Sequence, residues 1–154
     1  MLRKLIKNQY GAAAVEMALV TPFLMVLMFG SFELGKYFWD NHIVAKAVRD
    51  GARYASRQAF SNFDCDAETV AAGVESSTQN LTRTNTLDGT GAVRLAGWTN
   101  AMITVDVACD DSGDYTSIYS GIEVPVVTVS ANVPYRSLFG SLGFTDATFR
   151  LRAQ

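Results

Sequence analysis

The chain has 154 residues, with 13 Lys and Arg against 15 Asp and Glu, a formal net charge of −2 and one histidine. This balance does not favour a nucleic-acid-binding protein, which would carry a marked basic excess. The length suffices for one small domain beside a membrane helix, but not for two. The single histidine, His42, is expected to be solvated, and it leaves no usual zinc ligand set or Ser-His-Asp triad. We therefore predict a protein that is not an enzyme and holds no metal or cofactor.

An apolar run dominates the first part of the chain. Every residue from Ala12 to Phe32 is apolar or small, except for Glu16 and a few hydroxyl side chains. A bilayer core is spanned by a helix of about 20 predominantly apolar residues, so we predict a transmembrane helix over residues 12–33. The basic residues before the run are Arg3, Lys4 and Lys7. Basic residues before a span stay in the cytoplasm, so we expect the C-terminal part to be exported.

The junction between the basic segment and the apolar run carries a short motif. Gly11 precedes Ala12, and Glu16 is the fifth residue when counting starts at Ala12. This arrangement resembles the class III signal of type IV pilins and pseudopilins, in which a peptidase cuts after a glycine and the fifth mature residue is glutamate. The string Gly-Ala-Ala-Ala-Val-Glu-Met-Ala-Leu-Val-Thr-Pro-Phe-Leu resembles the TadE-like minor pseudopilins of the tight-adherence (Tad/Flp) pilus. So do Phe32-Glu33-Leu34-Gly35 and Asp50-Gly51-Ala52-Arg53-Tyr54-Ala55.

The resemblance covers about residues 11–57 and implies a structural or assembly protein for a pilus used in surface adherence and biofilm formation. It implies cleavage of a leader, residues 1–11, by a prepilin peptidase between Gly11 and Ala12. It also implies an assembly role for Glu16. The implied partners are other pilins and pseudopilins, the peptidase and an inner-membrane assembly platform. The protein would lie in the bacterial inner membrane, with a cytoplasmic N-terminus and a periplasmic or extracellular C-terminal domain.

Two departures from the pattern favour a minor component. Met17 follows Glu16 where the major pilin usually has tyrosine, and the exported part is far larger than that of a major subunit. The sequence leaves open a TadE or a TadF role, and a pseudopilin of a type II secretion system. It also leaves open an uncleaved, membrane-anchored periplasmic binding module.

Helical periodicity continues beyond the apolar run. The small and apolar residues of this stretch step by three or four positions, which places them on one helix face: Val44, Val48, Gly51, Ala55 and Ala59. We therefore predict one helix from near Ala12 to near Phe60, with residues 34–60 as its amphipathic continuation. Pro22 removes a backbone donor and is expected to bend or loosen this helix locally.

Residues 61–154 are predicted to form the exported α+β domain. After a break at residues 61–64, helical spacing predicts a second helix over 66–81, capped by Asp64 or Asp66. Residues 85–97 are rich in Thr, Gly and Asn and read as a loop, with a short strand at 92–95. Apolar alternation predicts strands near 103–109 and 127–133, and a last strand that contains Phe149 and Leu151. Ser137 to Gly143 is predicted to be a turn.

The predicted fold class follows from this pattern of elements. Each strand has one polar face, which argues for an antiparallel sheet whose other face packs on a helix. The fold is therefore α+β: a long N-terminal helix, membrane-spanning in its first half, packed on a small antiparallel sheet with one further helix.

The two cysteines, Cys65 and Cys109, both lie in the part that we expect to be exported. We predict that they form a disulfide, which would be worth about 4 kcal/mol in the chain-entropy model. The alternative is two separate buried thiols. The turn with Asp110, Asp111 and Asp114 is expected to be solvated, because it lacks the spacing and the closing glutamate of an EF-hand, and calcium binding is left open.

Overall fold

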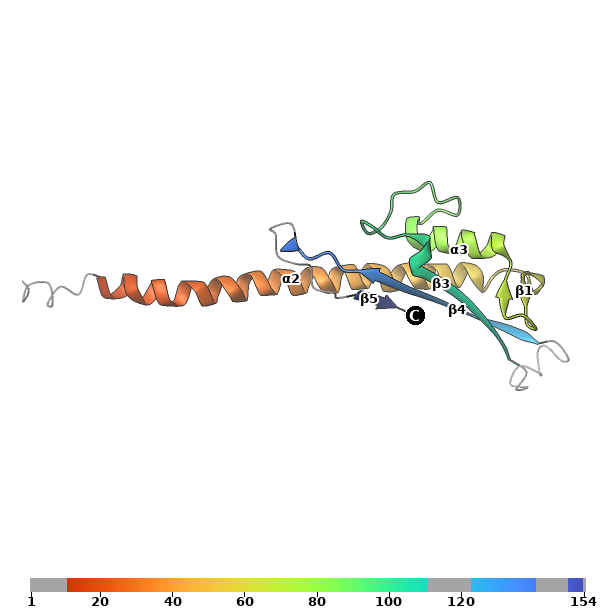
Figure 1. Cartoon of the computed structure of the whole chain (residues 1–154), viewed down its shortest axis with the longest axis horizontal. Coiled ribbons are helices and arrows are strands. Elements are labelled where there is room, and N and C mark those ends of the chain that lie inside the picture. Colours follow the sequence, from red (N-terminus) through yellow and green to blue (C-terminus); the bar gives the residue numbers. More distant parts are fainter. Residues whose placement is uncertain (1–10, 111–122, 141–149, 154) are drawn as a thin grey trace, which may run out of the picture. The chain divides into compact units, whose positions relative to one another are not determined.

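The computed structural model describes residues 11–110, 123–140 and 150–153 (Figure 1). The chain divides between Tyr37 and Phe38 into two compact units, here called the N-terminal and C-terminal units, and helix α2 contributes to both. The described elements are, in chain order, α2 (Ala12–Ala55), η2 (Phe60–Asn62), β1 (Phe63–Asp64), β2 (Thr69–Val70), α3 (Ala72–Thr84), η3 (Asn100–Met102), β3 (Ile103–Asp110), β4 (Val124–Pro134) and β5 (Arg150–Ala153). The predicted α+β class is confirmed.

Helix α2 begins at the predicted residue but ends at Ala55, so the predicted end near Phe60 is wrong. After Ala55 the main chain forms a tighter turn, in which the N–H of Arg57 bonds to the carbonyl three residues earlier, that of Tyr54, at 3.2 Å. The Ser56 hydroxyl donates to the carbonyl of Arg53, and the Gln58 amide donates to that of Tyr54. These groups satisfy the last carbonyls of the helix and so help to end it. Pro22 lies inside α2 without ending it.

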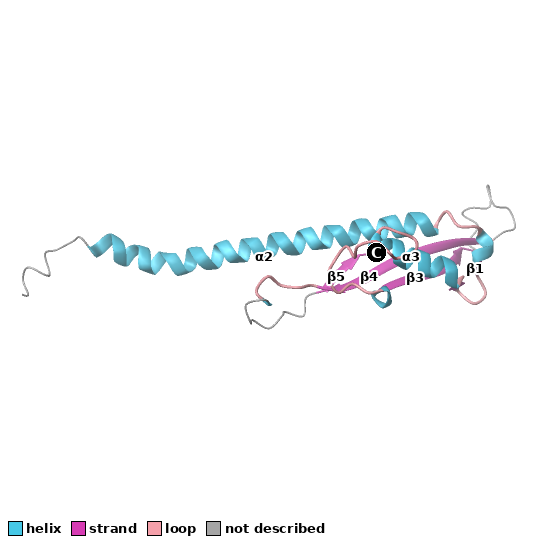
Figure 2. Cartoon of the chain, turned by 90° about the horizontal axis from the view of Figure 1, so that it is seen from above, coloured by secondary structure: helices cyan, strands magenta, loops and turns pink. Residues whose placement is uncertain are grey.

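The core of the C-terminal unit is formed by one face of α2 and one face of the sheet. On α2 the predicted stripe is buried from Val44 to Ala55, whereas Ala59, beyond the helix end, is exposed. On the sheet every second residue is buried: Ile103, Val105, Val107, Val129, Ala131, Val133 and Leu151. Each fully buried valine or leucine contributes about 1.5–3 kcal/mol by leaving water. In both views the three strands lie beside the later part of α2 (Figures 1 and 2).

The sheet is antiparallel, as predicted, and its strands lie in the order β3-β4-β5. Its register places Val105 opposite Val129, and Val133 opposite Leu151, so these side chains share the buried face. Strand β3 pairs along β4 from Val124 to Ala131, but β5 pairs only with Ala131 to Pro134. The predicted last strand is present from Arg150, and Phe149 lies outside the described residues, as do Ser141 to Gly143 of the predicted turn.

The second helix is shifted from its predicted place. It was expected over residues 66–81, but α3 runs from Ala72 to Thr84, and β1 and β2 form a small hairpin before it. Asp64 does not cap a helix; its Oδ1 accepts a hydrogen bond from the N–H of Ala67 within the hairpin turn. Glu68 has a φ of 50°, a left-handed conformation that a right-handed helix cannot include. Asn85, with a φ of 66°, ends α3.

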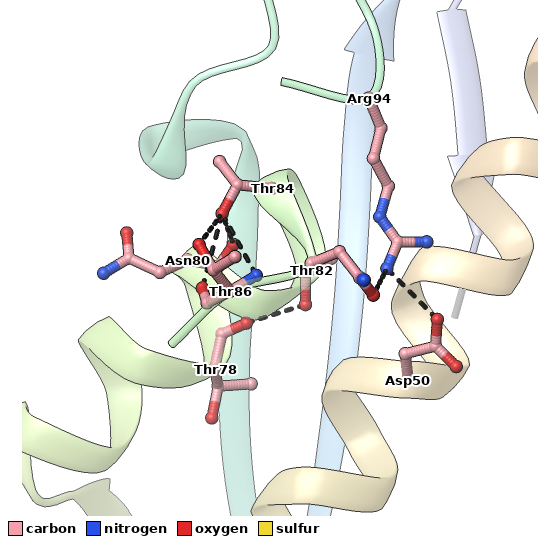
Figure 3. Close-up of polar contacts among 8 residues, drawn as sticks. Asp50, Thr78, Asn80, Thr82, Thr84, Thr86 and Arg94 are labelled. Atoms are coloured by element: carbon pink, nitrogen blue, oxygen red, sulfur yellow. Dashed lines mark hydrogen bonds and ion pairs between the residues drawn. The ribbon is translucent and has the colours of Figure 1, made fainter. Parts of the chain in front are cut away.

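Helices α2 and α3 approach each other closely at Gly51 of α2. Thr78 and Thr82 of α3 are fully buried, and their hydroxyls donate to the carbonyls of Val74 and Thr78 at 2.7 and 2.8 Å. The hydroxyls are thereby satisfied within their own helix (Figure 3). A Cβ added to Gly51 would overlap Thr82 Oγ1. Only glycine therefore allows the two helices to approach this closely.

The loop after α3 is held by polar side chains, and the strand predicted at residues 92–95 is absent from the described structure. Arg94 donates through Nη2 to Asp50 Oδ2 at 3.1 Å and to Asn85 Oδ1 at 2.7 Å (Figure 3). Its N–H bonds to the carbonyl of Arg83 at 3.0 Å. Hydrogen bonds from the Thr90 N–H and hydroxyl lower the pKa of Asp88. The N–H of Arg94, which a strand could have used for pairing, is thus bonded to the end of α3.

Candidate functional site

The predicted cleavage point coincides with the start of the long helix. Gly11 is exposed directly before α2, and Ala12 is the first residue of the helix. Among the described residues, and apart from the adjoining backbone, no heavy atom lies within 4 Å of the position that a Cβ on Gly11 would occupy. Residues 1–10 lie outside the described residues, and with them Arg3, Lys4 and Lys7. The Gly11–Ala12 bond is thus at the surface, where the chain enters a helix.

Glu16 lies one helical turn after Ala12, at the spacing i and i+4 that places two side chains on the same face. Its side chain is exposed, and the described part of the chain offers it no hydrogen bond or ion pair. Around it the surface is apolar: Val15 is 61% and Met17 63% exposed. A carboxylate in such surroundings has no counter-charge within its own described chain, and one must come from elsewhere if this surface leaves water.

The first half of α2 exposes apolar side chains on all sides. Residues 12–32 are all exposed, and Phe23 and Val26 exceed 70%. Of the described helices, α2 is the one that is long and apolar enough to cross a membrane. The hydroxyls of Thr21 and Ser31 donate to the carbonyls of Met17 and Leu27 at 2.6 and 2.7 Å, which meets their bonding needs without water. These features indicate a membrane anchor; the limits of the span, residues 12 and 33, stay a prediction.

Cys65 and Cys109 are joined in the structure. Their sulfur atoms lie 1.98 Å apart and their Cα atoms 5.5 Å apart, which ties the β1–β2 hairpin to the end of β3. A carboxylate oxygen of Glu123 lies within 4.8 Å of the sulfurs. Because each sulfur is bonded to the other, neither is available as a thiolate ligand, and we assign no metal to this cluster.

The disulfide in the native protein remains a prediction, and thiol counting tests it. Protein purified from its host without reductant and then denatured should incorporate no thiol-reactive label. After reduction the same sample should incorporate two labels per chain, which controls for access to both sulfurs. Two labels before reduction would show that Cys65 and Cys109 are separate thiols.

The remaining predicted positions are His42 and the acidic turn after β3. His42 is exposed on α2, as expected for a solvated side chain. Asp110 ends β3, whereas Asp111 and Asp114 lie outside the described residues. Calcium binding by this turn therefore stays open, as in the sequence analysis. The ion pair between Asp50 and Arg94 was not predicted. Their separation of 44 residues gives a sequence pattern no means of detecting it.

An exposed apolar helix followed along the chain by a compact α+β unit suggests a membrane-anchored protein with one folded domain. The family model of the TadE-like proteins matches residues 11–53, which confirms the resemblance expected from the motif over a little more than a quarter of the chain. This match supports an association with the Tad pilus; the TadE-like proteins are a structural family and are not known as enzymes. Searches of curated proteins and of solved structures found no match.

The limits of the match correspond to features of the fold. It begins at Gly11, before the helix, and ends at Arg53, two residues after the glycine that contacts α3. The matched segment therefore includes the exposed apolar surface and the buried stripe as far as Gly51, whereas Ala55 lies beyond it. Strands β3, β4 and β5 lie beyond it.

Proposed function

We propose that this protein is a minor pseudopilin that acts in the biogenesis of a Tad/Flp pilus used in surface adherence. The observation that carries the proposal is a coincidence of three boundaries. The family match, the predicted cleavage site and the helix start all fall at Gly11 and Ala12. A glycine at this point lets the chain leave helical geometry and enter a narrow protease site.

In the proposed mechanism, a prepilin peptidase removes the leader and leaves Ala12 with a free amine. The apolar half of α2 holds the protein in the inner membrane until it is transferred to an assembling filament. The amine of Ala12 on a docked subunit pairs with Glu16 of the incoming one. The C-terminal unit is exported, where it contacts other pilins and pseudopilins, while the membrane segment meets the assembly platform.

Two other functions are compatible with the same anchor. An uncleaved, membrane-anchored binding module would keep the leader, and a pseudopilin of a type II secretion system would be cleaved but would leave piliation intact. The match to the TadE-like proteins favours the Tad pilus over both. N-terminal processing separates the first alternative from a pseudopilin, and piliation separates the second.

Processing between Gly11 and Ala12 is the test of this function. Protein purified from its host should have Ala12 as its N-terminal residue, as measured by intact mass and N-terminal sequencing. Gly11→Leu should leave the full-length precursor in the membrane, because the larger side chain disfavours entry to the protease. A wild-type protein that retains residues 1–11 would contradict the proposal.

The matched control for this substitution is Gly35→Leu. Gly35 lies in α2, and a Cβ there would meet no atom within 4 Å, as at Gly11. The same increase in side-chain size should therefore leave processing intact. Loss of processing in both variants would mean that Gly11 has no special role at the cleavage site.

A further inference from the structure

The face of helix α2 that points away from the core of the C-terminal unit carries a line of basic side chains. Lys46, Arg49 and Arg53 are all exposed, and they are spaced by three and four residues. At about 100° per residue they fall within about 60° of one another, opposite the buried stripe from Val44 to Ala55. We call these three residues the basic ridge. At 1.5 Å per residue the ridge extends over about 10 Å of the helix.

The basic ridge has no counter-charge in the part of its own chain that the structure describes. None of the described residues forms a hydrogen bond or ion pair with the three ridge side chains. Asp50 is the one acidic residue between Asn41 and Arg57, and its carboxylate is bonded to Arg94. Like charges three and four residues apart on a helix repel one another, so an anionic partner from outside would stabilise the ridge.

The β1–β2 hairpin carries the opposite charge. Asp64, Asp66 and Glu68 are exposed within five residues, and we call them the acidic tip. No Lys or Arg occurs between Arg57 and Arg83 to neutralise it. Within the described part of the chain, the carboxylates of Asp66 and Glu68 have no bonded partner. In both views β1 lies near the C-terminal end of α2, so the tip follows the ridge along the molecule (Figures 1 and 2).

The backbone of the acidic tip is held in one conformation. The Oδ1 atom of Asp64 accepts a hydrogen bond from the N–H of Ala67 at 2.9 Å inside the turn. In the structure the bond between Cys65 and Cys109 ties the same turn to β3. A surface that is ordered beforehand loses less freedom when a partner binds, so these constraints favour the tip as a binding element.

The charges of this chain favour a second copy as the partner of the ridge. The ridge and the tip present three charges each, of opposite sign, and both are exposed. Two copies anchored in one membrane by the same apolar helix run parallel. Because the tip follows the ridge along the molecule, the ridge of one copy meets the tip of the other only when the copies are displaced along the helix axis. Such a contact joins two different surfaces, so further copies can add in the same way.

The position of the ridge disfavours lipid headgroups as its partner. Lys46 lies 13 residues beyond residue 33, the predicted end of the span. Along the helix this corresponds to about 20 Å, at 1.5 Å per residue. Charges are largely screened beyond about 8 Å at physiological ionic strength. Arg49 and Arg53 lie farther still along the same helix.

We propose that the basic ridge of one copy binds the acidic tip of a second copy, with the two copies parallel and displaced along the axis of α2. The contact goes beyond the proposed function, because it requires only two copies in one membrane. It does not depend on processing at Gly11 or on the charge of Glu16. Failure of this contact and failure of the proposed function are therefore separate results.

Zero-length crosslinking tests the contact. Arg49→Lys with Arg53→Lys keeps the charge of the ridge and supplies amines that a carbodiimide joins to carboxylates in direct contact. Full chains with natural and with heavy nitrogen are mixed and reconstituted in phosphatidylcholine vesicles, which carry no net charge. The introduced lysines should give mixed-isotope crosslinks to the acidic tip. Arg152→Lys is the matched control, since Arg152 is exposed on β5, and its crosslinks to the tip should be several-fold fewer.

Charge reversal on separate copies supplies a second measurement. Arg49→Glu with Arg53→Glu reverses the ridge, and Asp66→Lys with Glu68→Lys reverses the tip. Each variant alone should form about tenfold fewer crosslinked dimers than the wild type, because two or more attractive pairs become repulsive. An equal mixture of the two variants should restore the dimer, because the reversed ridge then meets the reversed tip. Recovery in the mixture also shows that both variants fold.

Several results would overturn the proposal. Crosslinks from the introduced lysines that are no more frequent than those of the Arg152→Lys control would show no preference for the ridge. Crosslinks confined to one isotope would show a contact within a single chain. Crosslinks to carboxylates outside the acidic tip, or a variant mixture that does not recover the dimer, would show that the tip is not the partner.

Discussion

A strain whose only copy of this protein carries Glu16→Gln is expected to insert and process the protein normally, yet to assemble few or no pili. Glu16 has no counter-charge in its own described chain and lies one turn from Ala12 on an apolar surface. In the proposed filament, the amine of a neighbouring Ala12 would neutralise it. Removing one charge of a buried pair leaves the other uncompensated, at a cost of about 3–5 kcal/mol. Electron microscopy of pili and intact mass of the protein measure the two effects separately.

The matched control is Glu33→Gln, the same chemical change at the other end of the predicted span. Glu33 belongs to the same helix but lies far from the amine of Ala12. It should therefore leave pilus number near normal. Normal piliation in the Glu16→Gln strain would show that the charge is dispensable, and equal loss in both strains would show that the effect is not specific to Glu16.

The second large effect is expected from Gly51→Val, which should destabilise the C-terminal unit by about 3 kcal/mol or more. Even the first added carbon would overlap Thr82 Oγ1, and Thr82 is fully buried with its hydroxyl bonded to the carbonyl of Thr78. Overpacking a core of this kind typically costs about 1–3 kcal/mol per site, and valine adds two further carbons. For a domain of this size each kcal/mol lowers Tm by roughly 4 °C, so a thermal melt of the full chain in detergent measures the loss.

The cause of this loss can be isolated with paired variants. Gly51→Ala alone should lower Tm, and adding Thr82→Ala should restore part of it, because the overlapping hydroxyl is gone. Thr82→Val keeps the volume of threonine and should not rescue. Gly73→Ala in α3 is the control, since a Cβ there meets no atom within 4 Å. If Gly51→Ala is as harmless as Gly73→Ala, the close approach of the helices does not limit stability.

Elements with strong periodicity could be predicted from the sequence. The stripe from Val44 to Ala55 and the alternation from Ile103 to Val107 are both buried as expected. These patterns repeat because one face of each element must leave water, so local sequence records the burial directly. The start of α2 was equally clear, because a long run that is apolar or small apart from Glu16 and the hydroxyl side chains begins directly after Gly11.

The segment between the two helices could not be predicted in the same way. Residues 66–71 have the composition of a helix start, yet they form part of a hairpin whose turn depends on Asp64 and on the backbone of Glu68. The contact between Cys65 and Cys109 holds the same hairpin against β3. These constraints are tertiary, and they outweigh helix propensities that differ by less than about 1 kcal/mol per residue.

The candidate site was also predictable only where its residues are close together in the sequence. Gly11, Ala12 and Glu16 follow one another closely enough for their spacing to be visible in the sequence. The partner of Asp50 and the reason for Gly51 could not be seen, because Arg94 and Thr82 are brought to α2 by folding. Arg94 lies in the stretch that was predicted as a loop, at the short strand expected over residues 92–95, which the structure does not form.

The bond between Cys65 and Cys109 also has a mechanical consequence. When the chain is pulled at its two ends, tension would travel from α2 through η2 and β1 to Cys65. With the bond closed, the load would pass directly from Cys65 to Cys109 and into β3, bypassing the 43 residues between them. Helix α3 and the loop held by Arg94 belong to that bypassed segment and would carry no tension through their backbone. Gly51 itself lies on the loaded helix α2, whereas Thr82, which it contacts, belongs to the bypassed segment.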